Sequence, residues 1–108
     1  MMKARILLVA ALFAASTSAL ASSGDASAGK KKSTTCAACH GAEGVSPSPE
    51  FPNLAGQYPD YLEKVITHYQ NGKRKNPIMA AQVKSLSHKD VADLAAYFSS
   101  MKGLKVQH

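Results

Sequence analysis

Residues 36–40 read Cys36-Ala37-Ala38-Cys39-His40, and this stretch decides what the rest of the chain has to build. Two thiols three positions apart, followed at once by an imidazole, form the attachment pattern of a c-type haem. The thiols can add to the two vinyl groups of a porphyrin and fix it to the chain by thioether bonds. The imidazole is then held beneath the iron, where one of its ring nitrogens can ligate the metal. The sequence therefore predicts one covalently attached haem c.

A thiol–disulfide redox pair is the main alternative for Cys36 and Cys39. That chemistry favours a CxxC at the start of a helix within a βαβ unit. Here the segment before Cys36 has a helical composition and no strand pattern is visible. A zinc site would need four suitably spaced ligands, which two cysteines and scattered histidines do not provide. Haem attachment is therefore the preferred interpretation.

The first 21 residues have the pattern of a secretory signal peptide. A short basic head precedes an uncharged apolar run over residues 6–15, and Ala19-Leu20-Ala21 matches an A-x-A cleavage site. The apolar run is too short to span a bilayer as a mature helix, and a retained N-terminal anchor is the alternative. We therefore expect residues 22–108 to form a monohaem domain in the periplasm, without stable membrane insertion.

The mature chain is small for a protein that must build its own hydrophobic core. Cleavage after Ala21 would leave 87 of the 108 residues, and domains of this size often depend on a disulfide, a metal or a cofactor. Only two cysteines are present, both in the haem motif, and a bridge between them would close a tiny loop. The haem is thus the expected centre of the core, and the chain without it should be poorly folded.

The charge balance indicates the kind of partner. The chain carries 13 Lys and Arg against 7 Asp and Glu, a net charge of +6, which favours acidic proteins or anionic membrane surfaces. No nucleic-acid-binding motif accompanies the charge in a chain that is expected to be exported, so nucleic acid is excluded as a partner. Lys30-Lys31-Lys32 and Lys73-Arg74-Lys75 are candidates for a docking patch, and a solvated helix face or turn is the alternative for each.

The chain before and after the motif reads as helices and loops. Asp25 can cap a helix over residues 25–35, in which Gly29 would permit the close approach of another backbone. Pro59 opens a second helix that Gly72 ends. The apolar side chains of that helix recur at helical spacing: Tyr61, Leu62, Val65, Ile66 and Tyr69.

The last helix is the best marked. Ser87 can cap it, with Asp90 at N3 in a short variant of the capping box, and Gly103 is predicted to end it. Its apolar stripe consists of Val91, Leu94, Ala95, Phe98 and Met101. Residues 41–57 have the composition of a loop, and residues 78–84 are ambiguous between a loop and a helical turn. The predicted fold is all-α, with three or more helices wrapped around one haem.

These residues together resemble the class I c-type cytochromes, most closely the small monohaem bacterial cytochromes and each half of the dihaem ones. The resemblance covers nearly the whole mature chain. Beyond the haem motif it depends on Gly24-Asp25, Gly29, residues 52–57, Tyr61-Leu62, residues 72–74, residues 76–80 and the stretch from Leu86 to Phe98. It implies that the first and last helices cross at Gly29 and Tyr97. One departure is Lys32, since many relatives carry an apolar or aromatic residue one turn before the first cysteine.

The resemblance also implies roles for site residues. His40 is similar to the proximal iron ligand, and Pro52 matches the proline whose backbone carbonyl accepts a hydrogen bond from the other ring nitrogen. Leu54 resembles a haem-packing residue, and Met79 resembles the distal axial ligand.

Met79 can also be argued from the residues alone. Outside the expected signal peptide the only other methionine is Met101, which lies on the apolar stripe of the last helix and is most simply core. Met79 follows Pro77 in a predicted loop, from which its sulfur could reach the iron, and a gap-filling core role is the alternative. His68 is the rival axial ligand.

We expect an electron carrier rather than an enzyme, because an iron held by His and Met has no open position for a substrate. The neutral thioether of Met favours ferrous iron, and it raises the reduction potential relative to ligation by two histidines. The expected partners are an electron donor and an electron acceptor of a respiratory chain. Each could be a protein with an acidic docking surface or a membrane-bound oxidase or reductase, and the complexes should be small and transient. We expect a monomer.

Arg74 and Asn76 are candidates to bind the haem propionates, with a solvated turn as the alternative. A gas-binding or sensory haem protein with a weak sixth ligand is the functional alternative.

Overall fold

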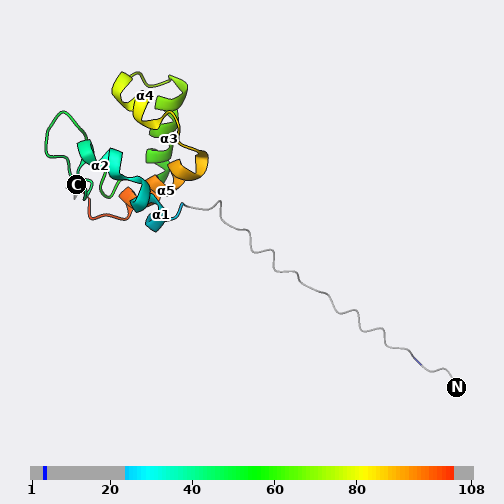
Figure 1. Cartoon of the computed structure of the whole chain (residues 1–108). Coiled ribbons are helices and arrows are strands. Elements are labelled where there is room, and N and C mark those ends of the chain that lie inside the picture. Colours follow the sequence, from blue (N-terminus) through cyan, green and yellow to red (C-terminus); the bar gives the residue numbers. More distant parts are fainter. Residues whose placement is uncertain (1–3, 5–23, 104–108) are drawn as a thin grey trace, which may run out of the picture.

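Five helices build the part of the protein that the structure describes. This computed structural model describes residues 24–103 together with Ala4, and its helices are α1 (Ala26–Lys32), α2 (Thr34–His40), α3 (Pro59–Asn71), α4 (Pro77–Val83) and α5 (His88–Ser99) (Figure 1). No strand occurs among the described residues, and the predicted all-α class is confirmed. Apart from Ala4, the predicted signal peptide lies outside the described residues. No helix in residues 24–103 is long and apolar enough to cross a membrane.

α1 and α2 follow each other closely and carry the haem motif. Asp25 caps α1 as predicted, since its carboxylate accepts hydrogen bonds from two backbone N–H groups of the first turn. The prediction of one helix over residues 25–35 is wrong, because α1 ends at Lys32 and α2 begins at Thr34. Between them the hydroxyl of Ser33 donates a hydrogen bond to a carbonyl in the last turn of α1 at 2.8 Å. The haem motif is therefore part of a helix of its own.

α1 crosses α5 at Gly29, and this is the most extensive contact between helices (Figure 1). A Cβ atom on Gly29 would lie 2.0 Å from the carbonyl oxygen of Asp93 and 2.8 Å from Cβ of Tyr97. Real Cβ atoms do not approach other atoms so closely, and the lack of a side chain allows the two backbones to touch. The crossing of the first and last helices at Gly29 and Tyr97 is confirmed.

Charged side chains reinforce this crossing. Asp93 is only 1% exposed, and its carboxylate accepts a hydrogen bond from the backbone N–H of Asp25 at 2.8 Å. Nζ of Lys32 and of Lys89 donate to the same carboxylate at 2.7 and 2.9 Å, and Lys32 also reaches Asp90 at 2.7 Å. Hydrogen bonds from Lys32 lower the pKa of Asp93, and they lower the pKa of Asp90 to about 2. Lys32, the departure from the family pattern noted above, thus joins α1 to α5 by charge.

α3 has the predicted ends. Pro59 is its first residue, and Gly72 follows its last residue in the left-handed conformation, with φ +80°. The side-chain amide of Gln70 donates hydrogen bonds of 2.9 Å to the carbonyls of both Val83 and Leu86. This amide therefore ties the C-terminal part of α3 to the chain that leaves α4.

The ambiguous stretch after Pro77 is a helix, α4. The side chain of Asn76 accepts hydrogen bonds from the backbone N–H groups of Ile78 at 3.0 Å and Met79 at 3.1 Å. Pro77 occupies the first helical position, where its fixed φ suits a helix and its missing N–H is not needed. Asn76 and Pro77 together therefore start α4.

Ser87 and Asp90 form the predicted capping box at the start of α5. The helix ends at Ser99, so the prediction that Gly103 ends it is wrong. Gly103 instead approaches the loop before α3, since a Cβ atom on it would lie 2.2 Å from the carbonyl oxygen of Ala55. The segment after α5 thus closes on that loop.

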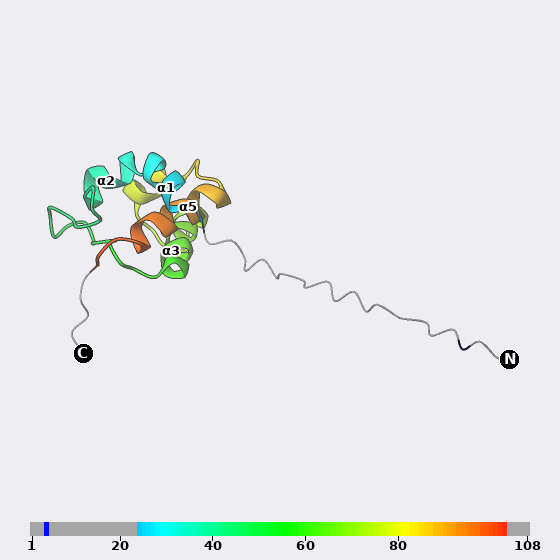
Figure 2. The same ribbon diagram turned by 90° about the horizontal axis from the view of Figure 1, so that it is seen from below.

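The hydrophobic core lies between α3 and α5, with α1 on the other side of α5 (Figure 2). Its buried members are Leu62, Leu94, Ala95 and Phe98. Half-buried side chains pack around them, namely Cys36, Leu54, Leu86, Tyr97 and Met101. Because Cys36 is among them, the core is directly beside the haem motif.

Candidate functional site

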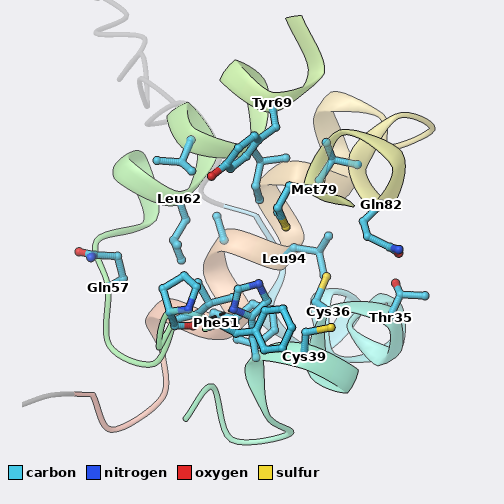
Figure 3. A pocket seen from close by; sticks show the side chains of 18 of the residues that line it. Thr35, Cys36, Cys39, Phe51, Gln57, Leu62, Tyr69, Met79, Gln82 and Leu94 are labelled. Atoms are coloured by element: carbon cyan, nitrogen blue, oxygen red, sulfur yellow. Dashed lines mark hydrogen bonds between the residues drawn. The ribbon is translucent and has the colours of Figure 1, made fainter. Parts of the chain in front are cut away.

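A cavity of about 300 Å³ lies between α2, the loop of residues 51–57, α3, α4 and α5 (Figure 3). Its volume is at the lower end of the range for small-molecule and cofactor sites. The apolar rows predicted for α3 and most of the stripe predicted for α5 form its wall: Tyr61, Leu62, Val65, Ile66, Tyr69, Leu94, Ala95 and Phe98. The apolar faces of α3 and α5 therefore line this cavity as well as forming the core between the two helices.

α2 presents three reactive side chains to this cavity. Cys36, Cys39 and His40 all line it, and their i, i+3, i+4 spacing puts them on one face of the helix. Both cysteines are half-buried, and they form no disulfide with each other. Figure 3 shows their sulfur atoms close together on the same side of the cavity.

The environment of Cys36 does not suit a redox thiol. Burial raises the pKa of the Cys36 thiol and outweighs the lowering effect of the hydrogen bond with Thr35. A cysteine that attacks disulfides needs the opposite shift, because the thiolate is the nucleophile. The environment of Cys36 is therefore unlike that of a reactive redox thiol.

A backbone carbonyl orients His40. The imidazole is buried, and its Nδ1 lies 2.7 Å from the carbonyl oxygen of Pro52. Since a carbonyl can only accept, Nδ1 carries the proton and donates it, which leaves Nε2 free. The ring of Phe51 lies edge-on to the imidazole, with centroids 6.4 Å apart. Metal-ligating histidines are typically held in this way, with one nitrogen bound to a fixed acceptor.

Hydrogen bonds hold the loop that carries Pro52 and Leu54. The carbonyl of Gly44 accepts from the N–H of Leu54 at 2.8 Å, and the side chain of Asn53 accepts from the N–H of Ser46 at 2.6 Å. Gly44 has φ +70°, a conformation that favours glycine. Leu54 lines the cavity and packs against the core, so this loop places both residues at the cavity wall.

Met79 reaches the cavity from α4. Figure 3 shows its sulfur pointing into the cavity from the side opposite Cys36 and Cys39. The prediction that Met79 lies in a loop is wrong, because it is the third residue of α4. Met101 packs against the core and is not among the lining residues. The structure therefore brings one of the two methionines to the cavity.

Among the described residues, the other histidines and one of the two propionate candidates do not line the cavity. His68 and His88 are not among the lining residues, and His108 lies outside the described residues. Asn76 is not a lining residue either, and its side chain caps α4. Several residues line the cavity that could not be predicted from the sequence, because they belong to no periodic pattern. They are Thr35, Phe51, Gln57, Gln82 and Val83.

Arg74 does line the cavity, and within residues 24–103 no other Lys, Arg, Asp or Glu does. Its guanidinium carbon lies 5.6 Å from the centroid of the Tyr69 ring, which is within the range of a cation–π contact. One fixed positive charge is therefore available at the cavity for an anionic group.

These residues fit a covalently bound haem. The two thiols can form thioethers, and the free Nε2 of His40 and the sulfur of Met79 are donors that haem iron accepts. An apolar wall surrounds them, as a porphyrin requires, and Arg74 offers a partner for a carboxylate.

Comparison with known proteins agrees with the site. The family model described as Cytochrome c matches residues 26–102. The chain is 47% identical over 97 residues to cytochrome c4 of Pseudomonas aeruginosa, a match that covers 89% of this chain and 48% of that protein. It is 46% identical over 82 residues to cytochrome c-554(548) of Halomonas halodenitrificans, which covers 73% of this chain and 99% of that protein.

The fold has a counterpart among solved structures. Reduced recombinant cytochrome c4 from Pseudomonas stutzeri superposes with a TM-score of 0.71 at 44% sequence identity, covering 75% of this chain and 47% of that one. The chain thus spans about half the length of the cytochrome c4 proteins that it matches and nearly all of the cytochrome c-554(548).

Proposed function

Because the chain belongs to the cytochrome c family, whose cofactor is haem c, we propose that it is an electron carrier and not an enzyme. Bound haem c supplies the chemistry, since its iron takes up and releases one electron. The protein supplies attachment, orientation and a water-poor environment. The single observation that carries the proposal is that one cavity brings together the Cys-x-x-Cys-His face of α2 and the sulfur of Met79.

We assign Cys36 and Cys39 as the attachment residues, and His40 and Met79 as the axial ligands. The hydrogen bond from His40 to Pro52 supports this assignment, because it uses Nδ1 and holds the ring so that Nε2 is the nitrogen available to the iron. Two protein ligands would leave no axial position open for a substrate or a gas. The neutral thioether would also raise the reduction potential relative to a pair of histidines.

Pro52 and Leu54 support the ligands in different ways. The carbonyl of Pro52 fixes the tautomer and the orientation of His40. Leu54, together with the apolar wall from α3 and α5, would pack against the porphyrin and keep bulk water from the iron. Arg74 is positioned to neutralise a propionate at the edge of the cavity.

We also propose that residues 1–21 direct export and are removed, and that residues 22–108 work in the periplasm as a monomer. The basic, apolar and small-residue segments of the N-terminus support export and removal of this segment, and the family match begins after it, at residue 26. The partners would be a respiratory electron donor and acceptor, including membrane-bound oxidases or reductases, and not nucleic acid.

The mass of the intact exported chain tests the proposal. Purified from a host that matures c-type cytochromes, the protein should weigh as much as residues 22–108 plus one haem. Its denatured form should show a thioether-type pyridine haemochrome spectrum. A variant with both Cys36→Ala and Cys39→Ala should lack covalent haem. A wild-type mass equal to the bare processed polypeptide, with two titratable thiols, would contradict haem attachment and favour thiol–disulfide exchange.

A further inference from the structure

Positive charge is concentrated in one part of the chain. Residues 64–89 contain six Lys and Arg and no Asp or Glu. All seven carboxylates lie outside this stretch, so that the rest of residues 22–108 has two more acidic than basic side chains. The stretch covers the C-terminal part of α3, the whole of α4 and the turn between them (Figure 1). The excess of positive charge therefore lies between the C-terminal part of α3 and the start of α5.

The two basic clusters of the chain differ in their ion pairs. In the first cluster, Lys32 is bound to Asp90 and Asp93, close to the acidic groups of α5. Among the described residues, no ion pair involves the second cluster, residues 73–75, whose side chains are exposed. Lys73 and Lys75 thus offer their charge to a partner, while carboxylates bind Lys32 of the first cluster.

The second cluster also lies at the cavity. Residues 71–78 are all exposed, yet Arg74 and Ile78 line the cavity. Ile78 is 58% exposed, which is high for a large apolar side chain, and it immediately precedes Met79. Here the cavity wall is also the surface of the protein. No residue of α1 lines the cavity, since α1 packs on α5 instead.

We propose that Lys73, Lys75 and Ile78, which we call the α3–α4 surface, are where this protein exchanges electrons with an acidic redox protein. The proposal rests on the electron-carrier function proposed above and selects one of the two basic clusters as the docking site. A partner surface with carboxylates around an apolar spot would complement the α3–α4 surface. The lysines would steer the encounter, and Ile78 would supply a small apolar contact. Contacts of this size suit a transient electron-transfer complex.

Two charge-matched variants of the holoprotein test the location. K73E/K75E and K30E/K31E change the net charge by the same amount, and all four lysines are exposed. Stopped-flow oxidation of each reduced protein by anionic hexacyanoferrate(III) at low ionic strength should be slowed about tenfold in K73E/K75E and less than about threefold in K30E/K31E. With cationic tris(phenanthroline)cobalt(III), oxidation should instead become faster in both variants, and more so in K73E/K75E than in K30E/K31E. Both differences should shrink at high ionic strength.

A macromolecular probe tests the acidic partner. Poly-L-glutamate should inhibit the oxidation of the wild type and K30E/K31E, and it should leave K73E/K75E unaffected. Equal slowing of both variants by hexacyanoferrate(III) would overturn the proposal, because net charge alone would then explain the effect. The proposal would also be overturned if K73E/K75E reacted with hexacyanoferrate(III) like the wild type but no longer bound phosphatidylglycerol vesicles, since the α3–α4 surface would then contact membranes. A wild-type holoprotein inert to both complexes would instead contradict the electron-carrier function itself.

Discussion

Nδ1 of His40 lies 2.7 Å from the carbonyl oxygen of Pro52, so the backbone, rather than a side chain, decides which nitrogen of the imidazole is protonated. Replacing the side chain at residue 52 cannot remove this acceptor. The position of the loop matters more for the tautomer than the identity of any single side chain.

The first prediction concerns this proton. In the diamagnetic ferrous holoprotein labelled with ¹⁵N-histidine, His40 should show a proton on Nδ1 that exchanges slowly with solvent, because the site is buried and hydrogen-bonded. Pro52→Ala should retain the resonance with faster exchange, since the carbonyl remains but the loop is less rigid. His68, which does not line the cavity, is the internal comparison. An unprotonated Nδ1 would show that the other tautomer is present.

The second prediction separates the two methionines. Met79→Ala should abolish the weak red band of sulfur–iron ligation in the ferric spectrum and lower the reduction potential, because a neutral sulfur donor is lost. Met101→Ala should keep the band and reduce the free energy of unfolding by about 1–2 kcal/mol, less than for a fully buried methionine. Loss of the band in the Met101 variant alone would reverse the two roles.

The third prediction concerns the crossing of α1 and α5. Gly29→Ala should lower the free energy of unfolding by about 2–4 kcal/mol, because its Cβ would collide with the backbone of Asp93. Gly72→Ala should cost only about 1 kcal/mol, since nothing lies within 4 Å of its Cβ and only the left-handed φ opposes it. Urea denaturation of both holoproteins gives the two values. Equal losses would mean that α1 can move away from α5 at little cost.

The fourth prediction is a pH dependence of stability. The carboxyl pKa of Asp90 falls from 3.8 to about 2 in the folded protein, and that of Asp93 is lowered as well, mainly by Lys32. Groups with a lowered folded pKa stabilise the fold above the unfolded value and lose this contribution as the pH falls towards the folded value. Unfolding should therefore become easier between about pH 4 and pH 2, with no comparable change from this cluster nearer neutrality.

A Lys32→Met variant tests the cause of that dependence. It should melt roughly 5 °C below the wild type near pH 7, because Asp93 stays buried with one cation fewer. Its stability should also fall less on acidification, since both carboxyl pKa values move back towards ordinary values. Parallel pH profiles for the variant and the wild type would exclude Lys32 as the origin of the shifts.

Local signals account for the helices that could be predicted. The capping box of Ser87 and Asp90, and the pair Pro59 and Gly72, mark their helices within one or two turns of the chain. α4 has a comparable start at Asn76-Pro77, but seven residues are too few to show an apolar period. The break at Ser33 separates residues that are all compatible with a helix, and a single hydroxyl hydrogen bond accompanies it.

Long-range contacts account for what the sequence did not reveal. The motif at residues 36–40 was recognisable because its chemistry is contained in one turn of helix. Phe51 and Gln82 reach the cavity only through tertiary packing and carry no pattern of their own. The role of Lys32 depends on Asp93, which is 61 residues away, and one sequence contains no sign of such a pairing.

The joining of α1 to α5 has a consequence for biogenesis. Because the first helix pairs with the last, a growing chain cannot complete its fold until α5 has been synthesised. For the export proposed above, this would leave the polypeptide unfolded for passage through a translocation channel, with both thiols accessible for attachment to the porphyrin.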